Sequence, residues 1–445
     1  MGSAREAALL TLTAMDRRKA WSNGQLQKVI RDAGLDRRDA ALATRLCFGV
    51  LQNRLLLDFY LQQCASMKLE KMDSKIRNDL RIGLYQMLFL NKIPSSAAVS
   101  EAVELAKKHC KNPRAAGMVN GILRTLARRL DNLPALDQSD RTAYLSLLYS
   151  HPRWLVELYS TRLPEEEVEA LLRWDNGEPP VTVQVNTLRA SAEEVITSLE
   201  EDGAHVAPHP WLPDCLILTG TGDVAALSAY RTGLLYAQDP AARLAVLALA
   251  PQSGDRVLDA CAAPGGKSFA AAIQMGDQGE IVSCDIHTHK KALILAGADR
   301  LGLKSVSARS LDSTQFRPQW EGRFDKVLAD VPCSGLGVVR KKPEIRYKDP
   351  QALADLPKLQ LEILNNVCRY LRPGGTLVYA TCTLLEAENE AITAAFLSAH
   401  PDFALDSFTL PGPLGTVEAG QCTLWPQRLE TDGFFLARFC RGGEG

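Results

Sequence analysis

Two cysteines stand where apolar, strand-like runs come to an end. Cys333 follows such a run in FDKVLADVPCSGLG, residues 324–337, and Cys382 follows another in GTLVYATCTLLEAENE, residues 375–390. A thiolate is a strong nucleophile and a good leaving group, so a cysteine in this position suits covalent catalysis. Because a free thiol titrates at about 8.5, such a site must favour the thiolate, for instance through nearby cations.

Aspartates occupy the ends of four successive runs of this kind, at Asp259, Asp285, Asp312 and Asp330. An isolated aspartate usually caps a helix or forms a turn, but four strand ends in a row indicate an acid-lined pocket. An acid at the end of the second strand can accept hydrogen bonds from ribose hydroxyls. S-adenosylmethionine is cationic at sulfur and carries no phosphate, so it suits such a pocket better than ATP does.

A turn with two glycines separates the first of these runs from a helix. RVLDACAAPGGKS predicts strand, turn and helix, and the glycines let the backbone approach a ligand at the helix N-terminus. A P-loop requires glycine where Cys261 stands, and the dinucleotide fingerprint is absent as well. Besides Asp285, Asp312 and Asp330, the residues expected to bind the cofactor are Ala262, Ala263, Pro264, Gly265, Gly266 and Lys267.

All of these candidates belong to residues 236–445, where short apolar runs alternate with helical segments. This alternation predicts a parallel, doubly wound α/β sheet of the Rossmann-like kind, with ligands at the carboxyl ends of the strands. Other cysteines of the domain, Cys261, Cys284 and Cys368, lie within apolar segments and are expected in the core.

Three segments precede this domain, so the chain is predicted to be multidomain. Residues 1–131 carry apolar positions at three-and-four spacing and predict an all-α bundle; residues 132–175 predict a helical linker. Residues 176–235 predict a small α/β, RRM-like unit that could extend an RNA-binding track. The bundle holds 23 Lys and Arg against 12 Asp and Glu, which indicates a polyanionic partner. A solvated, arginine-rich surface is the simpler alternative.

The composition, 46% hydrophobic and 23% charged, is that of a globular protein. Its eleven cysteines are scattered without a CxxC pair, which indicates a reducing cytoplasm and neither disulfides nor a zinc site. His287 and His289 lack further ligands nearby, so we expect no metal there. No run approaches the roughly 18 apolar residues that span a bilayer, and the N-terminus lacks a secretion signal.

A basic segment, GVVRKKPEIRYKDP, follows the Cys333 motif directly. Cations with an aromatic residue beside the catalytic end of the sheet predict phosphate contacts and stacking on a splayed base. An exposed basic loop without this role is the alternative. The side chains concerned are Arg340, Lys341, Lys342, Arg346, Tyr347 and Lys348.

Together, DACAAPGGK, DVPCSGLG and YATCT resemble the motifs of RNA (cytosine-5)-methyltransferases of the Nol1/Nop2/Sun family. The N-terminus, with RLCFGVLQNRLLLD, IGLYQMLFL and AAVSEAVELAK, resembles the RNA-binding antitermination factor NusB. This fusion is characteristic of bacterial enzymes that modify 16S rRNA. The resemblance therefore implies a cytoplasmic, monomeric methyltransferase that uses S-adenosylmethionine and acts on a cytosine in a hairpin loop of 16S rRNA.

The family pattern also implies roles for four residues. Cytosine C5 is a weak nucleophile, so the enzyme first adds a thiolate to C6. Cys382 is then the nucleophile, Cys333 assists product release, Asp330 binds the N3/N4 edge of the base, and Lys267 positions the base or offsets its charge. DNA cytosine methyltransferases attack with a Pro-Cys thiol, so the two cysteine roles could be exchanged.

Ala380 and Thr383 depart from the serines usual in the family, which leaves the hydrogen bonding around the nucleophile open.

Two other functions remain open from the sequence. A methyltransferase acting on an exocyclic amine typically uses an Asn/Asp-Pro-Pro-aromatic turn, and DVPC places a thiol where the aromatic residue would stand. The second alternative is a NusB-like RNA-binding or assembly factor with an inactive methyltransferase domain. Against this second alternative, Asp285, Asp330, Cys333 and Cys382 are all intact.

Overall fold

The computed structural model describes residues 3–18 and 22–443, so the first two residues of the N-terminal segment lie outside it. The chain forms two compact units. One contains Met1–Gly177 with Val339–Lys348, and the other contains Glu178–Val338 with Asp349–Gly445.

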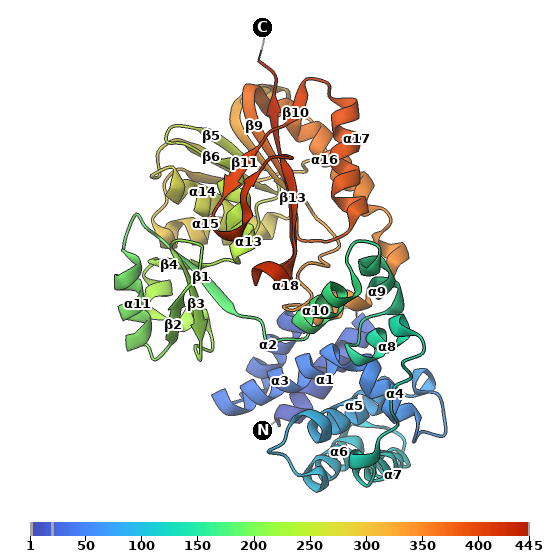
Figure 1. Ribbon diagram of the computed structural model, residues 1–445. Coiled ribbons are helices and arrows are strands. Elements are labelled where there is room, and N and C mark those ends of the chain that lie inside the picture. The colour runs from blue at the N-terminus through green and yellow to red at the C-terminus, as the bar shows by residue number, and fades with distance from the viewer. Residues whose placement is uncertain (1–2, 19–21, 444–445) are drawn as a thin grey trace. The chain divides into compact units, whose positions relative to one another are not determined.

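The first unit is helical, as the apolar spacing predicts. Aspartate side chains cap helices of this unit, with Asp36 accepting from the backbone of α3 and Asp73 from that of α5. Apolar residues one turn apart, such as Leu46 and Val50, are buried in a single core. The bundle consists of α1 (Ala4–Arg18), α2 (Ser22–Ala33), α3 (Arg37–Gln52), α4 (Arg54–Gln62), α5 (Ser74–Phe89), α6 (Ser95–His109) and α7 (Ala115–Ala127) (Figure 1).

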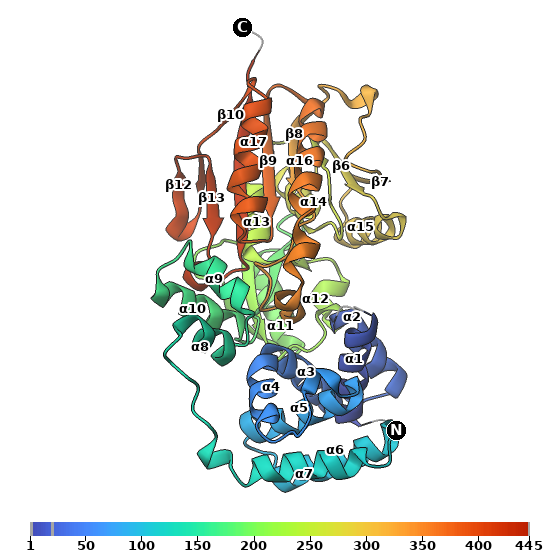
Figure 2. The ribbon, with the colours of Figure 1, turned by 90° about the vertical axis from the view of Figure 1, so that its right-hand side faces the viewer.

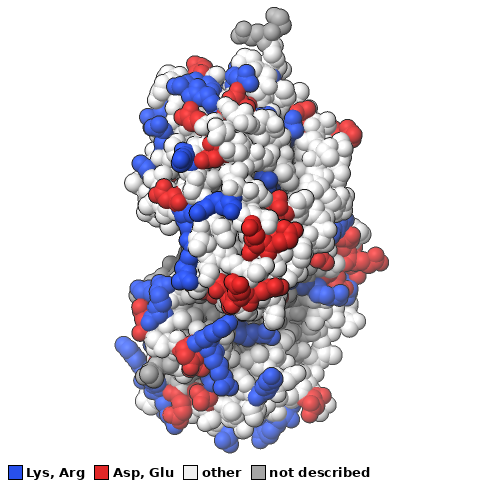
Figure 3. Space-filling model, turned by 90° about the vertical axis from the view of Figure 1, so that its left-hand side faces the viewer, with Lys and Arg blue, Asp and Glu red and all other residues white. Residues whose placement is uncertain are grey.

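The surface of this bundle, in the lower part of Figure 3, shows Lys and Arg side chains interspersed with Asp and Glu. Its excess of positive charge is therefore not gathered into one continuous basic face on the side in view.

The unit is completed by α8 (Arg141–Leu148), α9 (Arg153–Ser160), α10 (Glu165–Asp175) and the 3₁₀ segment η5 (Pro343–Tyr347).

The prediction that Arg346 contacts RNA is wrong. Arg346 is completely buried in the helical unit, and its guanidinium donates to the side-chain oxygen of Asn176 at 2.6 Å. The Tyr347 hydroxyl donates to the carbonyl of Leu51 at 2.8 Å. A guanidinium presents several donors in a fixed fork, so it can hold buried polar groups as well as phosphates, and a basic sequence does not distinguish the two.

A small antiparallel sheet, the predicted α/β unit, begins the second unit. Its strands β1 (Val181–Val185), β2 (His205–Pro208), β3 (Cys215–Thr219) and β4 (Leu235–Ala237) lie in the order β2-β3-β1-β4. Helix α11 (Ala192–Glu201) begins with a capping box of Ser191 and Glu194 and buries Val195 and Leu199 with the strands. Its exposed side carries several glutamates, including Glu193 and Glu200, so this helix face does not suit RNA.

The main sheet is doubly wound, as predicted, but it is mixed rather than wholly parallel. Strands β5 to β9 run parallel, whereas β14 pairs antiparallel with β9. Strands that run parallel must be joined by a crossover connection, whereas β14 follows its antiparallel partner β13 after a short connection. The sequence did not reveal this, because an apolar run has the same pattern in either strand direction.

The strands of this sheet lie in the order β10-β14-β9-β8-β5-β6-β7, with β13 paired to β14. They are β5 (Arg256–Asp259), β6 (Glu280–Asp285), β7 (Val306–Ser310), β8 (Phe324–Asp330), β9 (Leu371–Thr381), β10 (Phe403–Leu405), β13 (Gln421–Leu424) and β14 (Phe434–Arg441).

Helices cover both faces of the sheet (Figure 2). Two cores result, because alternate strand residues face opposite sides: Val257 packs with Phe269 and Ile294, whereas Leu258 packs with Ile363 and Phe396. The helices are α13 (Pro240–Leu249), α14 (Gly266–Gln274) and α15 (Thr288–Leu301) on one face and α16 (Leu356–Val367) and α17 (Glu390–Ala399) on the other. Within residues 3–18 and 22–443, none of the helices has the length and apolar character needed to cross a bilayer.

Candidate active site

Two paired strands bring the two predicted thiols together. Strands β8 and β9 lie side by side in parallel, with Asp330 opposite Ala380, so the loops after both strands leave the same edge of the sheet. The Sγ atoms of Cys333 and Cys382 are 3.1 Å apart, and both residues are partly exposed. Motifs about fifty residues apart in the sequence therefore form one site.

The contact makes the two thiols unequal. The hydrogen bond to Cys382 and burial raise the pKa of Cys333 well above its ordinary value, and the nearby carboxylates of Glu388 and Asp330 add to the rise. The raised pKa disfavours the thiolate form of Cys333. Either sulfur can donate in this contact, and when Cys333 donates, its hydrogen bond stabilises negative charge on Cys382.

A partly buried ion pair lies beside the thiols. Lys267 Nζ is 2.5 Å from Asp330 Oδ2, and the Lys267 side chain is 13% exposed. Burial lowers the pKa of Lys267, but the carboxylates of Asp330 and Asp259, with a smaller contribution from Cys382, outweigh it, so the pKa is raised on balance. The site thus holds a permanent cation within electrostatic reach of the Cys382 sulfur.

The predicted cofactor loop, Ala262 to Gly266, connects β5 to α14. Gly265 has φ +113°, and a Cβ at this position would lie 2.5 Å from a ring atom of Phe269, so only glycine fits. Gly266 begins α14, which places the free N–H groups of the first helical turn directly after the loop. A backbone concavity of this kind can accept a polar ligand.

Three of the four predicted aspartates are the last residues of their strands, β5, β6 and β8. Asp312 is not: β7 already ends at Ser310, and the Asp312 carboxylate accepts hydrogen bonds from the backbone and hydroxyl of Thr314 at 3.0 and 2.7 Å. Local turn formation, the ordinary role of an isolated aspartate, accounts for this residue.

The carboxylates of β5 and β6 differ in their surroundings. Asp259 is buried, accepts the Ser268 hydroxyl at 2.7 Å, and has its pKa raised by burial to about 6. Asp285 accepts the backbone N–H of His287 at 2.9 Å and pairs with Lys290 at 3.4 Å. Asp285 is therefore the better candidate for binding a polar ligand as an anion.

No group of three metal-ligating side chains occurs in the described part of the chain, and His287 and His289 are exposed. The predicted core thiols Cys284 and Cys368 are buried, whereas Cys261 is only partly so.

Sequence reasoning missed Asn389, which lies directly behind Cys382. Its side chain accepts the Thr381 hydroxyl at 2.6 Å and donates to the Thr383 carbonyl at 3.0 Å, so it binds the residues on both sides of Cys382. Asn389 is completely buried. The only signal is the polar run Glu-Asn-Glu soon after the cysteine, because such a run otherwise predicts an exposed turn.

Glu388 holds the other thiol loop in the same way. Its carboxylate accepts the backbone N–H of Ser334 at 2.9 Å and the side-chain amide of Gln360 at 2.7 Å. Gln360 also donates to the carbonyl of Pro332 at 3.0 Å. Both neighbours of Cys333 are thereby fixed by buried polar groups, which predefines the position of this thiol.

The hydroxyl of Thr383 bridges the two thiol loops. It lies 2.6 Å from the hydroxyl of Ser334. The departure from serine at this position therefore preserves a hydroxyl that can make a hydrogen bond.

A further missed residue is Gln238. Its side-chain amide is buried and makes no hydrogen bond within the described residues. The amide nitrogen lies 3.3 Å from where a Cβ of Gly266 would stand, so it adjoins the cofactor loop. Because buried amides are nearly always paired, this group is a candidate ligand contact.

The doubly wound sheet with its loop, strand-end acids and paired thiols defines the second unit as a methyltransferase domain. Residues 246–440 match the family model described as 16S rRNA methyltransferase RsmB/F, residues 2–128 match the NusB family, and residues 151–225 match a ferredoxin-like domain of RsmF/B-like methyltransferases. The chain belongs to the ribosomal RNA small subunit methyltransferase B family.

Relatives and solved structures agree with this assignment. The chain is 37% identical to the probable ribosomal RNA small subunit methyltransferase B of Bacillus subtilis, over 99% of each chain. It is 34% identical to the Klebsiella pneumoniae enzyme of that name, over 91% of this chain and 90% of that one. The crystal structure of PH0851 has a TM-score of 0.82 and 27% identity, covering 98% of each chain.

A methyltransferase homologue from Pyrococcus horikoshii has a TM-score of 0.58 and 26% identity, over 68% of this chain and 99% of its own.

Proposed function

We propose that the protein transfers a methyl group from S-adenosylmethionine to C5 of a cytosine in bacterial 16S rRNA, through a covalent bond between Cys382 and C6 of the base. The observation that carries this proposal is the 3.1 Å contact of two thiols beside the Lys267–Asp330 ion pair. Methylation of an exocyclic amine needs neither thiol. An inactive domain has no need for the buried polar groups that hold both of them.

The residues present fit S-adenosylmethionine. The loop Ala262–Gly266 contains a glycine that tolerates no side chain, and Gln238 presents an unpaired amide beside it. Asp285 at the end of β6 suits the ribose hydroxyls. When bound, S-adenosylmethionine supplies an electrophilic methyl group. Asp312 is a weaker candidate because its carboxylate is engaged in its own turn.

Cys382 begins the reaction. Its thiolate forms a bond from Sγ to C6 of cytosine, which moves an electron pair toward C5 and makes that carbon nucleophilic. Asp330 binds the N3/N4 edge of the base, and the Lys267 ammonium offsets the negative charge that develops. C5 then accepts the methyl group.

Release reverses the first bond. Solvent takes the C5 proton, the electron pair of the C5–H bond forms the C5–C6 double bond, and the C6–Sγ bond breaks with its electron pair returning to Cys382. Cys333 gives its proton to the departing sulfur 3.1 Å away, and the proton returns to Cys333 before the next attack.

The target base must leave its stack to reach a thiol at the edge of a sheet. An unpaired nucleotide in a hairpin loop of 16S rRNA meets this requirement at the lowest cost. We therefore propose a loop cytosine as the substrate.

The test compares the wild type, Cys333→Ser, Cys382→Ser and the control Cys440→Ser, each incubated with 16S rRNA transcript and S-adenosylmethionine. Cys440 lies in β14, outside the thiol pair. On a denaturing gel we expect a protein–RNA adduct to accumulate only with Cys333→Ser, and mass spectrometry of digested RNA should show 5-methylcytidine with the wild type and the control. An adduct with Cys382→Ser alone would exchange the roles, and methylation without Cys382 would end the mechanism.

A further inference from the structure

A pocket of about 410 Å³, separate from the proposed active site, lies within the helical unit. None of the proposed catalytic or cofactor residues lines it. We call it the Trp154 pocket and define it by the side chains that the argument uses, Arg54, Arg77, Arg81, Trp154, Tyr347 and Lys348. Its volume falls in the range of about 300–1,000 Å³ that is usual for ligand pockets.

Two of its arginines are already neutralised within the bundle. Arg81 makes two hydrogen bonds to Asp58, at 2.7 and 2.6 Å, and Arg77 pairs with Asp16 at 3.2 Å. Such bidentate and buried pairs leave little attraction for a further anion. These two arginines therefore form the wall of the pocket and do not recognise its ligand.

Arg54, the first residue of α4, is different. Its guanidinium carbon lies 5.0 Å from the centre of the Tyr347 ring, and within the described residues no carboxylate or carbonyl bonds to the guanidinium. Burial and the neighbouring Arg81 lower the pKa of Arg54, while Tyr347, Asp16 and Asp58 offset only part of this effect. A partly exposed guanidinium whose charge is incompletely compensated is stabilised by an anionic ligand.

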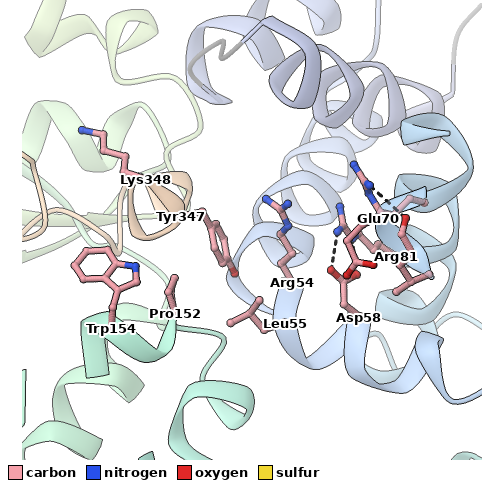
Figure 4. A pocket seen from close by; sticks show the side chains of 11 residues that line it. Arg54, Leu55, Asp58, Glu70, Arg81, Pro152, Trp154, Tyr347 and Lys348 are labelled. Carbon is pink, nitrogen blue, oxygen red and sulfur yellow. Dashed lines mark hydrogen bonds and ion pairs between the residues drawn. The ribbon is translucent and has the colours of Figure 1, made fainter. Parts of the chain in front are cut away.

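An aromatic platform completes the pocket. Figure 4 shows Trp154 and Lys348 to one side of Tyr347 and Arg54 to the other. Trp154 stands in the first turn of α9 and is partly exposed. Indole faces stack on nucleobases at roughly 1–3 kcal/mol per base, while a guanidinium suits a phosphate.

We propose that the Trp154 pocket binds one nucleotide of single-stranded RNA, with the phosphate on Arg54 and the base against Trp154. The ligand class rests on the proposed RNA substrate, but the site is separate from the site of methyl transfer. Tyr347, whose hydroxyl is tied to the carbonyl of Leu51, holds the Arg54 guanidinium in place beneath the phosphate.

The test measures binding of a fluorescein-labelled, single-stranded RNA of about ten nucleotides to the full chain over a range of KCl concentrations. The variants are Arg54→Gln and Trp154→Leu, and the matched control is Arg124→Gln, an exposed arginine of α7 that does not line the pocket. Arg54→Gln should weaken binding about tenfold and reduce the slope of log K against log salt by about 0.7. Trp154→Leu should weaken it about tenfold with the slope unchanged.

The proposal would be overturned if both variants bound the RNA with an affinity within twofold of that of the Arg124→Gln control. It would also be overturned if the control lost as much affinity as the variants, because that would indicate diffuse attraction or another class of ligand. If Arg54→Gln melts at a lower temperature than the wild type, crosslinking of the wild type to the same RNA carrying 4-thiouridine tests whether RNA occupies the Trp154 pocket. The tryptic peptide of residues 154–162 should carry the crosslink, and its absence there refutes the site. Wild type that binds RNA in this pocket without methylating it would refute the proposed function alone.

Discussion

Replacing Asn389 by alanine tests whether buried polar groups hold the nucleophile in place. The Asn389 side chain satisfies the hydroxyl of Thr381 and the carbonyl of Thr383, and alanine leaves both without a partner inside the core. A buried polar group that loses its partner costs roughly 1–3 kcal/mol. We therefore expect Asn389→Ala to lower the free energy of unfolding by at least about 2 kcal/mol, measured by urea denaturation.

The larger effect should appear in the rate. Because Asn389 binds both neighbours of Cys382, its loss lets the thiol move, and a misplacement of about 1 Å can reduce a rate roughly 100-fold. Asn389 is completely buried and cannot touch RNA, so KM for RNA should stay unchanged while kcat falls. Transfer of a tritiated methyl group to 16S rRNA transcript measures both constants.

Asn366→Ala is the matched control. Asn366 is also buried, in α16, and donates to the Ser313 carbonyl at 2.8 Å and the Tyr370 hydroxyl at 3.2 Å, away from both thiols. It should lose similar stability and keep its kcat. Equal kcat values for the two variants, or a loss for Asn389→Ala that appears in KM alone, would refute the positioning role.

Three more outcomes follow from the geometry. Gly265→Ala should reduce S-adenosylmethionine affinity in calorimetry at least tenfold, because a Cβ there collides with Phe269; unchanged affinity would remove the loop from the cofactor site. Lys267→Met leaves Asp330 without its cation and should lower kcat by roughly tenfold or more, which the tritium assay measures. Asp79, buried without a partner in the described structure, has its pKa raised by burial to about 8, so the folded state binds this proton more tightly than the unfolded state does. Stability should therefore be full below about pH 4 and fall as pH rises toward 8. Asp79→Asn should exceed the melting temperature of the wild type by more at pH 8.5 than at pH 5, and an equal difference at both pH values would contradict this.

The fold and the location of the site were predictable because they follow from local patterns. Apolar runs ending in Asp259, Asp285 and Asp330 are strands whose last residues face one edge of the sheet, and the runs before Cys333 and Cys382 end there too. The direction of β14 was not predictable, since the period of a strand is the same in both directions.

What the sequence could not reveal is which polar residues are buried. Arg346 and Asn389 both stand in polar stretches that predict exposure, yet each is completely buried because its donors and acceptors are satisfied by groups distant in sequence or across a turn. The expected place of Asp312 at a strand end was wrong for another reason: β7 ends at Ser310, and the Asp312 carboxylate accepts hydrogen bonds within its own turn. Burial of polar groups depends on tertiary hydrogen bonds, which no periodicity encodes.

The asymmetry of the thiol pair bears on the one role that the motifs left open. A nucleophile needs a sulfur that readily loses its proton, whereas a residue that assists release needs one that retains it. The hydrogen bond to Cys382 and burial raise the pKa of Cys333, with smaller contributions from the carboxylates of Glu388 and Asp330, while the charged Lys267 interacts with Cys382. Exchanging the two roles would therefore require the thiol with the raised pKa to ionise. This argument supports the proposed attack by Cys382 and the proposed acid role of Cys333.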